Sequence, residues 1–360
     1  HFLRIREAAP GSSIRSSAEY DAAAALVRLE DWAMAGQVLE EFRESFPGHE
    51  LQHDVTRQLA SVYREAGELD RSAEEYERVA AESEDPELQR EAMLLAGELY
   101  EDADRNDRAL SVYLRYVEQF PRPLDNAQET RFRIAQMYEA DGDIVAYHSM
   151  LESIVGSDAS AGEQRTDRSR FLAAQSALVL TERYFSSFAA IELVQPFEDS
   201  LASKQNSMDA ALAAFEDLVT YEVGEVTAAA TFYIAEIYLE FSRSLMASER
   251  PADLPANALV DYELALEEEA FPFEERAIDV HEQNYALVAS GFYNPWIQRS
   301  LEKLAGLMPG RYAKAEISSG FLGSIDFYAY RSPGARLMEL AEGDTSEAVN
   351  ADEPIAQAGE

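Results

Sequence analysis

One pentapeptide in this chain of 360 residues has the residue types and the spacing of a zinc-dependent hydrolase. His49, Glu50 and His53 form the pattern HExxH, in which two imidazoles one helical turn apart hold a zinc ion while the glutamate polarises a water molecule. If these residues share one helix, the chain could be a zinc-dependent peptidase. This is one alternative that the sequence leaves open.

The neighbours of this motif favour a structural interpretation. Pro47 and Gly48 come directly before it, so the first histidine is expected in a turn, ahead of the regular helix. Asp54 follows it at a place where zinc-peptidase helices keep apolar residues, and Leu59 stands where a third histidine would complete a site. We therefore expect exposed imidazoles at a helix start, with no metal and no other cofactor.

The rest of the sequence offers little catalytic chemistry. It contains no G-x-S-x-G, no P-loop and no G-x-G-x-x-G motif. His148 and His281 stand alone and are expected on helix surfaces or partly packed, and the acidic run 267–269 is typical of a solvated face. The chain has no cysteine, which excludes disulfides, thiolate zinc sites, iron–sulfur clusters and a cysteine nucleophile. We predict that it is not an enzyme.

Charge and hydropathy exclude two further kinds of partner. The chain has 30 Lys and Arg against 68 Asp and Glu, a net charge of −38, and no stretch concentrates the bases, so a nucleic-acid partner is not expected. No apolar run reaches the roughly 18 residues that a membrane span requires, so no membrane insertion is expected. The acidity fits either solvation in salty surroundings or an acidic face for a basic partner.

A pattern of small and large residues recurs every 37 or 38 residues in the first half of the chain. Each copy has a small residue, an apolar or aromatic residue three positions later, and an anchor residue twelve positions after the first. The small residues are Ala23, Ala60, Gly97 and Ala135, and the anchors are Ala35, Ser72, Ala109 and Tyr147. Two antiparallel helices per copy explain this spacing, because the small residue lets the helices approach closely. The chain should reverse at Gly67, Asp104 and Gly142.

This pattern resembles the tetratricopeptide repeat, whose period is about 34 residues. Pro47 and Pro121 stand where the family's closing proline stands, and the resemblance covers residues 18–155. The sequence departs from the family in its slightly longer period, in Tyr147 at a position that is normally alanine, and in the empty tryptophan position of the first helix. The resemblance implies helical hairpins that bind protein partners.

Longer helices are expected beyond residue 165. Apolar residues keep one face from Pro196 to about Tyr221, a helix of about seven turns that should pair with an equally long one over residues 166–194. The sixth hairpin should have an overlong first helix that ends near Ser248, before the loop 251–255.

A seventh hairpin is predicted from about Phe273 to Ser290, with Asn294 as the N-cap of its second helix. The predicted fold is an all-α, right-handed α-solenoid of about seven helix-turn-helix hairpins, with outsized hairpins in the second half. Its expected segments are a lead-in (1–17), four regular repeats (18–155), three extended hairpins (165–308), a capping segment (309–341) with a short extended piece near 325–331, and an acidic tail or linker (342–360). Because the sequence begins at His1 rather than Met, we expect the native N-terminus to lie upstream.

The first helices of the repeats are expected to line the inner wall of the solenoid. The predicted groove consists of Tyr20, Arg28, Arg57, Arg64, Glu98, Glu101, Phe132 and Glu139. It would have a basic entrance and an acidic far side, which suits an extended ligand with one acidic and one basic end. Arg57 partly fits the family's clamp for a terminal carboxylate, but no asparagine joins it, so a chaperone-tail clamp is not expected.

A second candidate interface lies among aromatic residues toward the C-terminus, because Trp and Tyr dominate protein interfaces when they are not core residues. It consists of Trp296, Tyr312, Tyr328 and Tyr330. These side chains could instead cap the final hairpin by folding the tail over it. A purely architectural protein that assembles with copies of itself is a further alternative.

The second half of the chain also resembles a region of bacterial cell-envelope tetratricopeptide proteins. The resemblance rests on segments 271–275, 281–282, 295–296 and 309–314. Some of those proteins accompany TonB-like energy-transduction machinery. The resemblance implies a non-enzymatic scaffold for a protein or peptide partner in an envelope complex, with the periplasm as its setting and the cytoplasm as the alternative.

Overall fold

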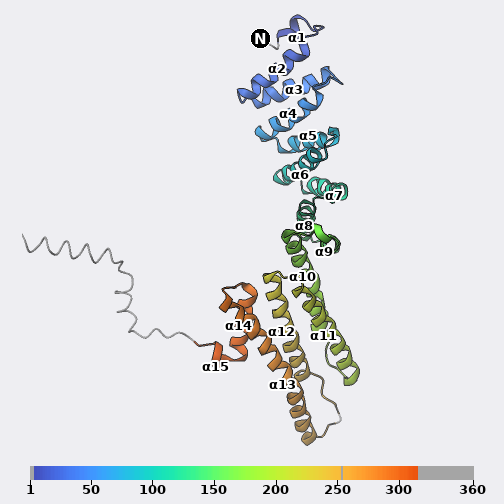
Figure 1. Cartoon of the computed structure of the whole chain (residues 1–360). Coiled ribbons are helices and arrows are strands. Elements are labelled where there is room, and N and C mark those ends of the chain that lie inside the picture. Colours follow the sequence, from blue (N-terminus) through green and yellow to red (C-terminus); the bar gives the residue numbers. More distant parts are fainter. Residues whose placement is uncertain (1–3, 253, 315–360) are drawn as a thin grey trace, which may run out of the picture. The chain divides into compact units, whose positions relative to one another are not determined.

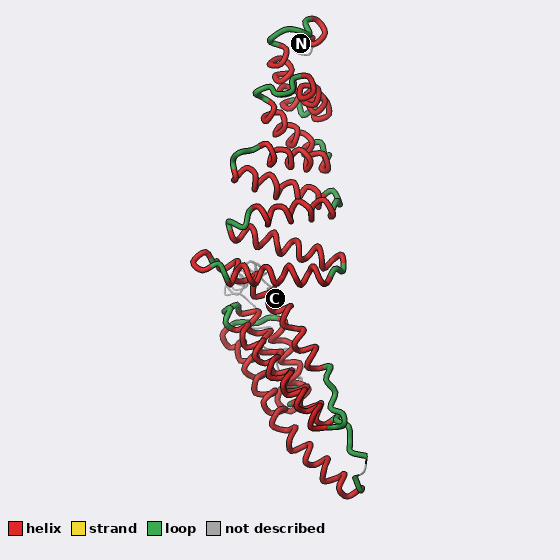
Figure 2. The backbone as a smooth tube through the Cα atoms, turned by 90° about the vertical axis from the view of Figure 1, so that its right-hand side faces the viewer, coloured by secondary structure: helices red, strands yellow, loops and turns green. Residues whose placement is uncertain are grey.

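The computed structural model describes residues 4–252 and 254–314, and these residues form helices and loops without a strand. Successive helices run back and forth and pack on their neighbours in the sequence (Figures 1 and 2). The predicted all-α solenoid of tetratricopeptide-like hairpins is thus confirmed. No helix of the described residues is both long enough and apolar enough to span a membrane.

The helices fall into short hairpins followed by long ones. After α1 (Arg4–Ala8), the four short hairpins are α2 (Arg15–Arg28) with α3 (Trp32–Ser45), α4 (Gln52–Glu65) with α5 (Leu69–Glu82), α6 (Pro86–Asp102) with α7 (Asn106–Gln119), and α8 (Leu124–Asp141) with α9 (Ile144–Ala159). The long ones are α10 (Asp167–Ala189) with α11 (Phe197–Val219), and α12 (Gly224–Met246) with α13 (Ala256–Ala286). Two 3₁₀ turns (Gly162–Gln164 and Leu287–Ser290), α14 (Pro295–Leu307) and α15 (Pro309–Tyr312) complete the described chain.

Contacts divide the chain into two compact units, residues 1–303 and residues 304–360. Of the second unit, the structure describes only residues 304–314, which form the end of α14 and α15. The predicted tail (342–360) and the extended piece near 325–331 lie outside the described residues.

The predicted spacing of the short repeats is confirmed by burial and by turn geometry. Each of the four small residues of the pattern is buried where a first helix packs on its neighbours. The turns between the paired helices pass through the left-handed backbone region at Glu30 (φ 58°), Gly67 (φ 76°), Asp104 (φ 58°) and Gly142 (φ 76°). This conformation reverses the chain directly after a helix and is least strained for glycine.

Equivalent tyrosine and arginine side chains connect the two helices of the second hairpin and those of the third. The Arg71 guanidinium lies 4.0 Å from the centre of the Tyr63 ring and donates a hydrogen bond of 2.7 Å to its hydroxyl. Arg71 also forms an ion pair with Glu40 on α3 of the preceding hairpin. One repeat later, Arg108 covers the Tyr100 ring at 5.5 Å. Cation–π attraction thus links the helices within each hairpin, and the ion pair of Arg71 with Glu40 links two adjacent hairpins.

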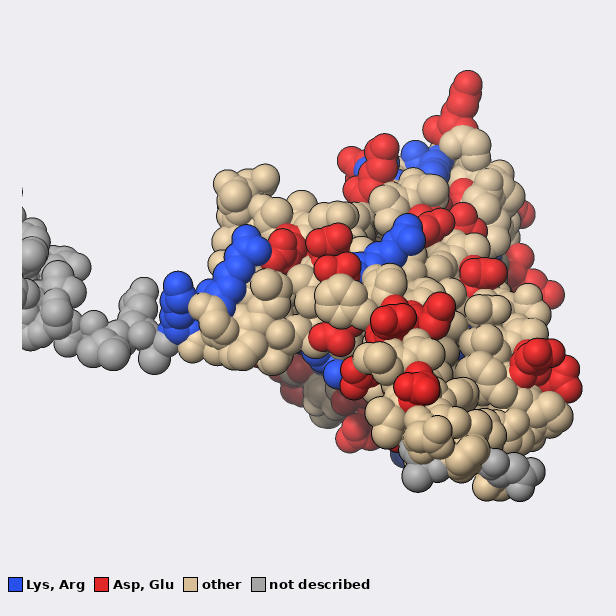
Figure 3. Space-filling view, turned by 90° about the horizontal axis from the view of Figure 1, so that it is seen from below, with Lys and Arg blue, Asp and Glu red and all other residues tan. Residues whose placement is uncertain are grey.

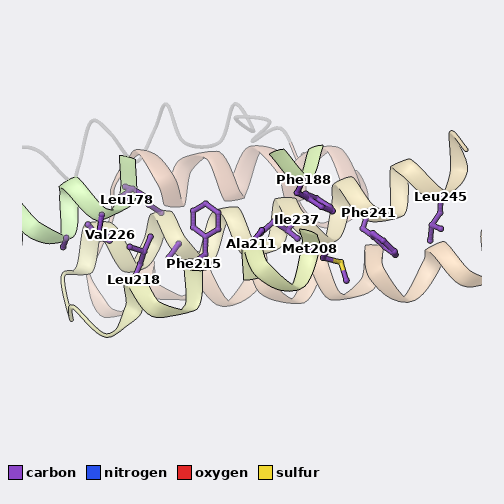
Figure 4. Packing of buried hydrophobic residues seen from close by; sticks show 14 of the residues in the cluster. Leu178, Phe188, Met208, Ala211, Phe215, Leu218, Val226, Ile237, Phe241 and Leu245 are labelled. Carbon is purple, nitrogen blue, oxygen red and sulfur yellow. The ribbon is translucent and has the colours of Figure 1, made fainter. Parts of the chain in front are cut away.

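The largest cluster of buried apolar side chains lies among α10, α11, α12 and α13 (Figure 4). Phe215 stacks on Tyr233 with ring centres 4.8 Å apart. Lys204 of α11 is fully buried beside this cluster, where its ammonium group donates to the backbone oxygens of Phe188 (3.3 Å) and Ile191 (2.8 Å). The lysine thus adds a hydrogen-bond donor to carbonyl groups in the last turn of α10 and just beyond it.

The predicted seventh hairpin is wrong at its first helix. Residues 273–286 do not begin a new element, because α13 continues through Pro272 in the middle of its 31 residues. Proline interrupts a helix by removing one hydrogen bond and by crowding the preceding turn. Here both Pro272 and Glu268, the residue whose carbonyl loses its bond, are exposed to solvent. The predicted cap is confirmed, since Asn294 Oδ1 accepts from the backbone N–H groups of Trp296 and Ile297, each at 3.0 Å.

Candidate partner-binding surface

An open pocket of about 450 Å³ lies where the second hairpin meets the third. It is lined by Glu50, His53, Asp54, Arg57, Val79, Glu82, Ser83, Glu84 and Leu88. Arg57 forms an ion pair with Asp54, and His53 Nδ1 lies 3.1 Å from Glu82 Oε2. Glu50 and Glu84 have no ion pair or hydrogen bond among the described residues. The pocket therefore presents two unneutralised carboxylates beside two apolar side chains.

The HExxH motif lines this pocket only in part. The helix α4 begins at Gln52, so His49 precedes it, as the sequence predicted, and Glu50 does too. His49 is half-buried, however, and not exposed as expected. His49 Nδ1 accepts the Leu51 backbone N–H at 3.2 Å, and its ring packs 5.4 Å from that of Phe42, whereas His53 faces Glu82. Within the described part of the chain, no group of three or more His, Asp or Glu is arranged to hold a metal ion.

A second pocket, of about 330 Å³, lies where the third hairpin meets the fourth. Its lining is Glu101, Asn106, Asp107, Leu110, Arg133, Gln136, Met137, Ala140 and Asp141. Arg133 Nη1 donates to Glu98 Oε1 at 3.2 Å and to the Tyr113 hydroxyl at 3.0 Å, and Arg133 Nε lies 3.6 Å from Glu101 Oε2. Burial raises the pKa of Glu101 despite this guanidinium. Asp107 and Asp141 have no ion pair among the described residues.

The structure thus brings two residues of the predicted groove, Arg57 and Glu101, into pockets in adjacent repeats. It also changes the expected polarity. Arg57 and Arg64 have carboxylate neighbours in Asp54 and, at 3.5 Å, Glu65, and the pocket around Arg57 is rich in acids. The end of the groove that was predicted to be basic is therefore acidic at Arg57.

The remaining groove residues lie outside both pockets. The Tyr20 hydroxyl accepts a 2.6 Å hydrogen bond from Gln58, and its ring packs against Phe42. Phe132 is half-buried against the cluster between α8, α9 and α10. Arg64 and Glu98, which have ion pairs with Glu65 and Arg133, also lie outside the pockets. Arg28 and Glu139 are exposed and have no ion pair among the described residues.

The second candidate interface is divided by the structure. Trp296 is half-buried, with its ring 5.6 Å from that of Phe232 and 5.5 Å from that of Tyr233, so it takes part in the core of the first unit. Tyr312 belongs to α15 in the second unit. Tyr328 and Tyr330 lie outside the described residues.

A buried polar cluster between α12, α13 and α14 was missed by the sequence analysis. His281 is fully buried rather than on a helix surface, with Nδ1 3.2 Å from Ser300 Oγ and Nε2 3.3 Å from Glu236 Oε1. Lys303 Nζ lies 2.5 Å from Glu236 Oε2, and Asn284 Nδ2 donates to Ser300 Oγ at 2.9 Å. Two features of the sequence could have indicated this cluster. One is the pair of polar residues three positions apart on each helix, His281 with Asn284 and Ser300 with Lys303; the other is Lys303 itself, one of only three lysines in the chain.

Hydrogen bonds of Asn284 and Ser300 connect the cluster to α12 and α14. Asn284 uses both amide protons, on Ser300 Oγ and on the Ala228 backbone oxygen (3.0 Å). The Ser300 hydroxyl therefore accepts from Asn284 and also contacts Nδ1 of His281, while Nε2 of the same ring faces Glu236. Burial alone would raise the pKa of Glu236, but the interactions of its carboxylate with His281 and Lys303 outweigh burial and lower the pKa. Since Ser300 and His281 are both fully buried, this chain of groups is placed to hold three helices together.

Comparisons with known proteins agree with the repeats. Residues 57–122 match the family described as Tetratricopeptide repeat. No curated protein matches the chain. A solved structure titled "Structure of Naa15/Naa10 bound to HypK-THB" is similar over 86% of this chain at 14% identity, with a TM-score of 0.28; the match covers 50% of that chain, so this chain spans about half of its length. The family match thus places tetratricopeptide repeats at residues 57–122, and the helical hairpins on either side of this segment repeat the same arrangement.

Proposed function

We propose that the chain is a non-enzymatic scaffold that holds an extended segment of a partner protein along the second, third and fourth hairpins. The single observation that carries this proposal is the pair of open pockets in adjacent repeats, each of which includes one residue of the predicted groove, Arg57 in the first and Glu101 in the second. Stacked helical hairpins form continuous surfaces to which every repeat contributes, so consecutive pockets suit one continuous ligand.

The free groups in the pockets indicate the chemistry of that ligand. Glu50 and Glu84 in the first pocket, and Asp107 and Asp141 in the second, have no neutralising partner among the described residues. Apolar surface beside these carboxylates comes from Leu88 in the first pocket and from Leu110 and Met137 in the second. A segment with Lys or Arg side chains would pair its charges with the carboxylates and lay its aliphatic stems on the apolar residues.

Charge reversal in the pockets tests this proposal. A variant with Glu50→Lys and Asp141→Lys places one base in each pocket at exposed positions, and should reduce the amount of partner that co-purifies from native extract, measured by quantitative mass spectrometry. The matched control, Asp209→Lys with Glu216→Lys, changes the net charge equally on the exposed surface of α11 and should retain the partner.

A third variant tests the competing interface. Tyr328→Ala with Tyr330→Ala removes two aromatic side chains of the predicted capping segment (309–341). Circular dichroism must first show that every variant is folded. Loss of the partner in this variant alone would move the binding site to the capping segment and refute the role of the pockets.

The bacterial cell envelope is the setting that we propose, with the periplasm as the compartment. The support is the resemblance of the second half of the chain to envelope tetratricopeptide proteins, in segments such as 271–275 and 309–314. A larger assembly with an energy-transducing system belongs to the same proposal. Fractionation of the native cells tests it: recovery of the chain in the cytoplasmic fraction would refute the proposed setting.

A further inference from the structure

One face of α13 exposes large apolar side chains to solvent. Val260, Leu264 and Phe271 are 64%, 56% and 58% exposed. At about 100° per residue they lie within about 40° of one another around the helix axis. The buried apolar residues of this helix, Leu266, Ala270 and Ala277, point in a different direction, about 80° or more away from each of these three side chains. The apolar side chains therefore form a stripe that the rest of the described chain leaves uncovered.

The stripe has the spacing of a coiled-coil seam. Positions 260, 264, 267, 271, 274 and 278 alternate steps of four and three residues, which is the heptad pattern of helix pairing. Leu264, Phe271 and the half-buried Ile278 occupy one of the two seam positions. The other seam position holds Val260, then Glu267 and Glu274. The seam thus alternates apolar and acidic residues over a length of about 27 Å.

The acidic positions of the seam are not neutralised by the chain itself. Neither Glu267 nor Glu274 has an ion pair or a hydrogen bond among the described residues. Further acids border the seam on both sides, Glu263 on one and Glu268 and Glu275 on the other, and Figure 3 shows Asp and Glu side chains spread over one face of the molecule. A second copy of α13 would bring like charges together, which disfavours self-pairing.

We propose that this seam, Val260, Leu264, Glu267, Phe271, Glu274 and Ile278, is a docking surface for a basic amphipathic helix of a partner protein. Such a helix places apolar side chains against Leu264 and Phe271 and Lys or Arg side chains against Glu267 and Glu274. The surface lies on one helix of the sixth hairpin and shares no residue with the pockets of the second to fourth hairpins. It gives the scaffold a second, independent attachment point.

Two synthetic helical peptides test the proposal by fluorescence anisotropy with the full chain. The basic peptide carries three heptads with Leu at one seam position and Lys at the other; the acidic peptide has Glu in place of each Lys. A scrambled basic peptide of equal composition measures the attraction that any cation has to a chain of charge −38. Binding is measured at moderate salt, where this general attraction is screened. We expect the basic heptad peptide alone to bind.

Charge exchange in the chain provides the decisive comparison. With Glu267→Lys and Glu274→Lys, the basic peptide should bind at least about tenfold more weakly and the acidic peptide should gain affinity. Asp209 and Glu216 on α11 are also exposed, unpaired among the described residues and seven residues apart, so Asp209→Lys with Glu216→Lys is the matched control and should leave binding unchanged.

The apolar part of the seam needs its own variant. Leu264→Ser with Phe271→Ser should also abolish binding, whereas Ile144→Ser with Val145→Ser, which removes exposed apolar side chains at the start of α9, should not. Equal binding of the heptad and scrambled peptides, or equal loss in the α11 control, would overturn the proposal. So would dimerisation of the wild-type chain that the Leu264→Ser, Phe271→Ser variant abolishes, because the occupant would then be a second copy.

Discussion

Replacement of Gly97 by alanine tests the close packing of the third hairpin. A Cβ atom at this position would lie 2.2 Å from Cε1 and 2.6 Å from Cζ of the Tyr113 ring. Carbon atoms in contact are normally about 3.5–4.0 Å apart, so the ring would have to move by more than an ångström. Tyr113 is fully buried, and its hydroxyl accepts a hydrogen bond from Arg133, which holds the ring in place.

Two opposing effects determine the size of the change. Alanine in place of a helical glycine stabilises the folded state by about 0.5–1 kcal/mol, because glycine loses more backbone entropy. Overpacking of a well-packed site costs about 1–3 kcal/mol. For Gly97→Ala we expect a net loss of about 1–2 kcal/mol in the free energy of unfolding, and for the larger Gly97→Leu a loss of about 2–4 kcal/mol.

Gly156 provides the matched control for this experiment. It lies in α9, is exposed, and has no neighbouring atom within 4 Å of an added Cβ. Gly156→Ala should therefore gain about 0.5–1 kcal/mol from helix propensity alone. Urea unfolding followed by circular dichroism at 222 nm should move the midpoints of Gly97→Ala and Gly156→Ala in opposite directions.

A double-mutant cycle with Tyr113→Leu isolates the contact with the ring. Tyr113→Leu will destabilise the chain by itself, but in that background Gly97→Ala should cost nothing or stabilise. If Gly97→Ala stabilises the wild-type chain as much as Gly156→Ala does, the close approach of the two helices is wrong, and so is the repeat register from which it was inferred.

Four further predictions concern turns, charge and metal. Glu30→Gly should raise the urea midpoint, by about 0.5–1 kcal/mol of stability, because its left-handed backbone (φ 58°) suits glycine; a lower midpoint would contradict the turn geometry. Glu236→Gln should destabilise the chain at pH 7. The pKa of Glu236 is lowered in the folded state, so its carboxylate contributes stability above the unfolded pKa near 4.5, and this contribution is lost as pH falls through the folded pKa. The urea midpoints of the wild type and the variant should therefore converge in acid, and a constant difference between them would count against the ion pair. The melting temperature of the wild type should rise from low to moderate sodium chloride, since screening weakens the repulsion of a net charge of −38, and a flat or falling curve would refute this. Metal analysis of the purified chain should find no stoichiometric zinc; tight one-to-one zinc abolished by His53→Ala would support the peptidase alternative.

The short hairpins were predictable because their signals are local. A small residue such as Ala60, an aromatic three positions later and a turn residue such as Gly67 all lie within one repeat, and their recurrence fixes the register. The break at Pro272 was wrong for a physical reason. Proline usually ends a helix, but on an exposed face of a long, packed helix the lost hydrogen bond is available to solvent, and packing on α12 maintains the helix.

The charges of the candidate site were less predictable. The repeat pattern predicted that Arg57 and Glu101 lie in the groove, but it did not predict their ion-pair partners. Asp54 lies one turn away, and Arg133 reaches Glu101 from the next hairpin. His281 was harder still, because its partners Glu236 and Ser300 come from two other helices and no repeat relates them.

The lengthening of the helices along the chain has a consequence for how the molecule opens. The helices α2 to α5 have 14 residues each, whereas α10 to α12 have 23 and α13 has 31. In a linear array each hairpin is stabilised only by its neighbours, so a longer interface raises the free energy of local opening. Amide hydrogens in the first hairpins should therefore exchange with solvent deuterium sooner than those of α12. A partner bound across the second to fourth hairpins would slow exchange where the free chain is least protected, and would thereby couple binding to the ordering of the weakest part of the array.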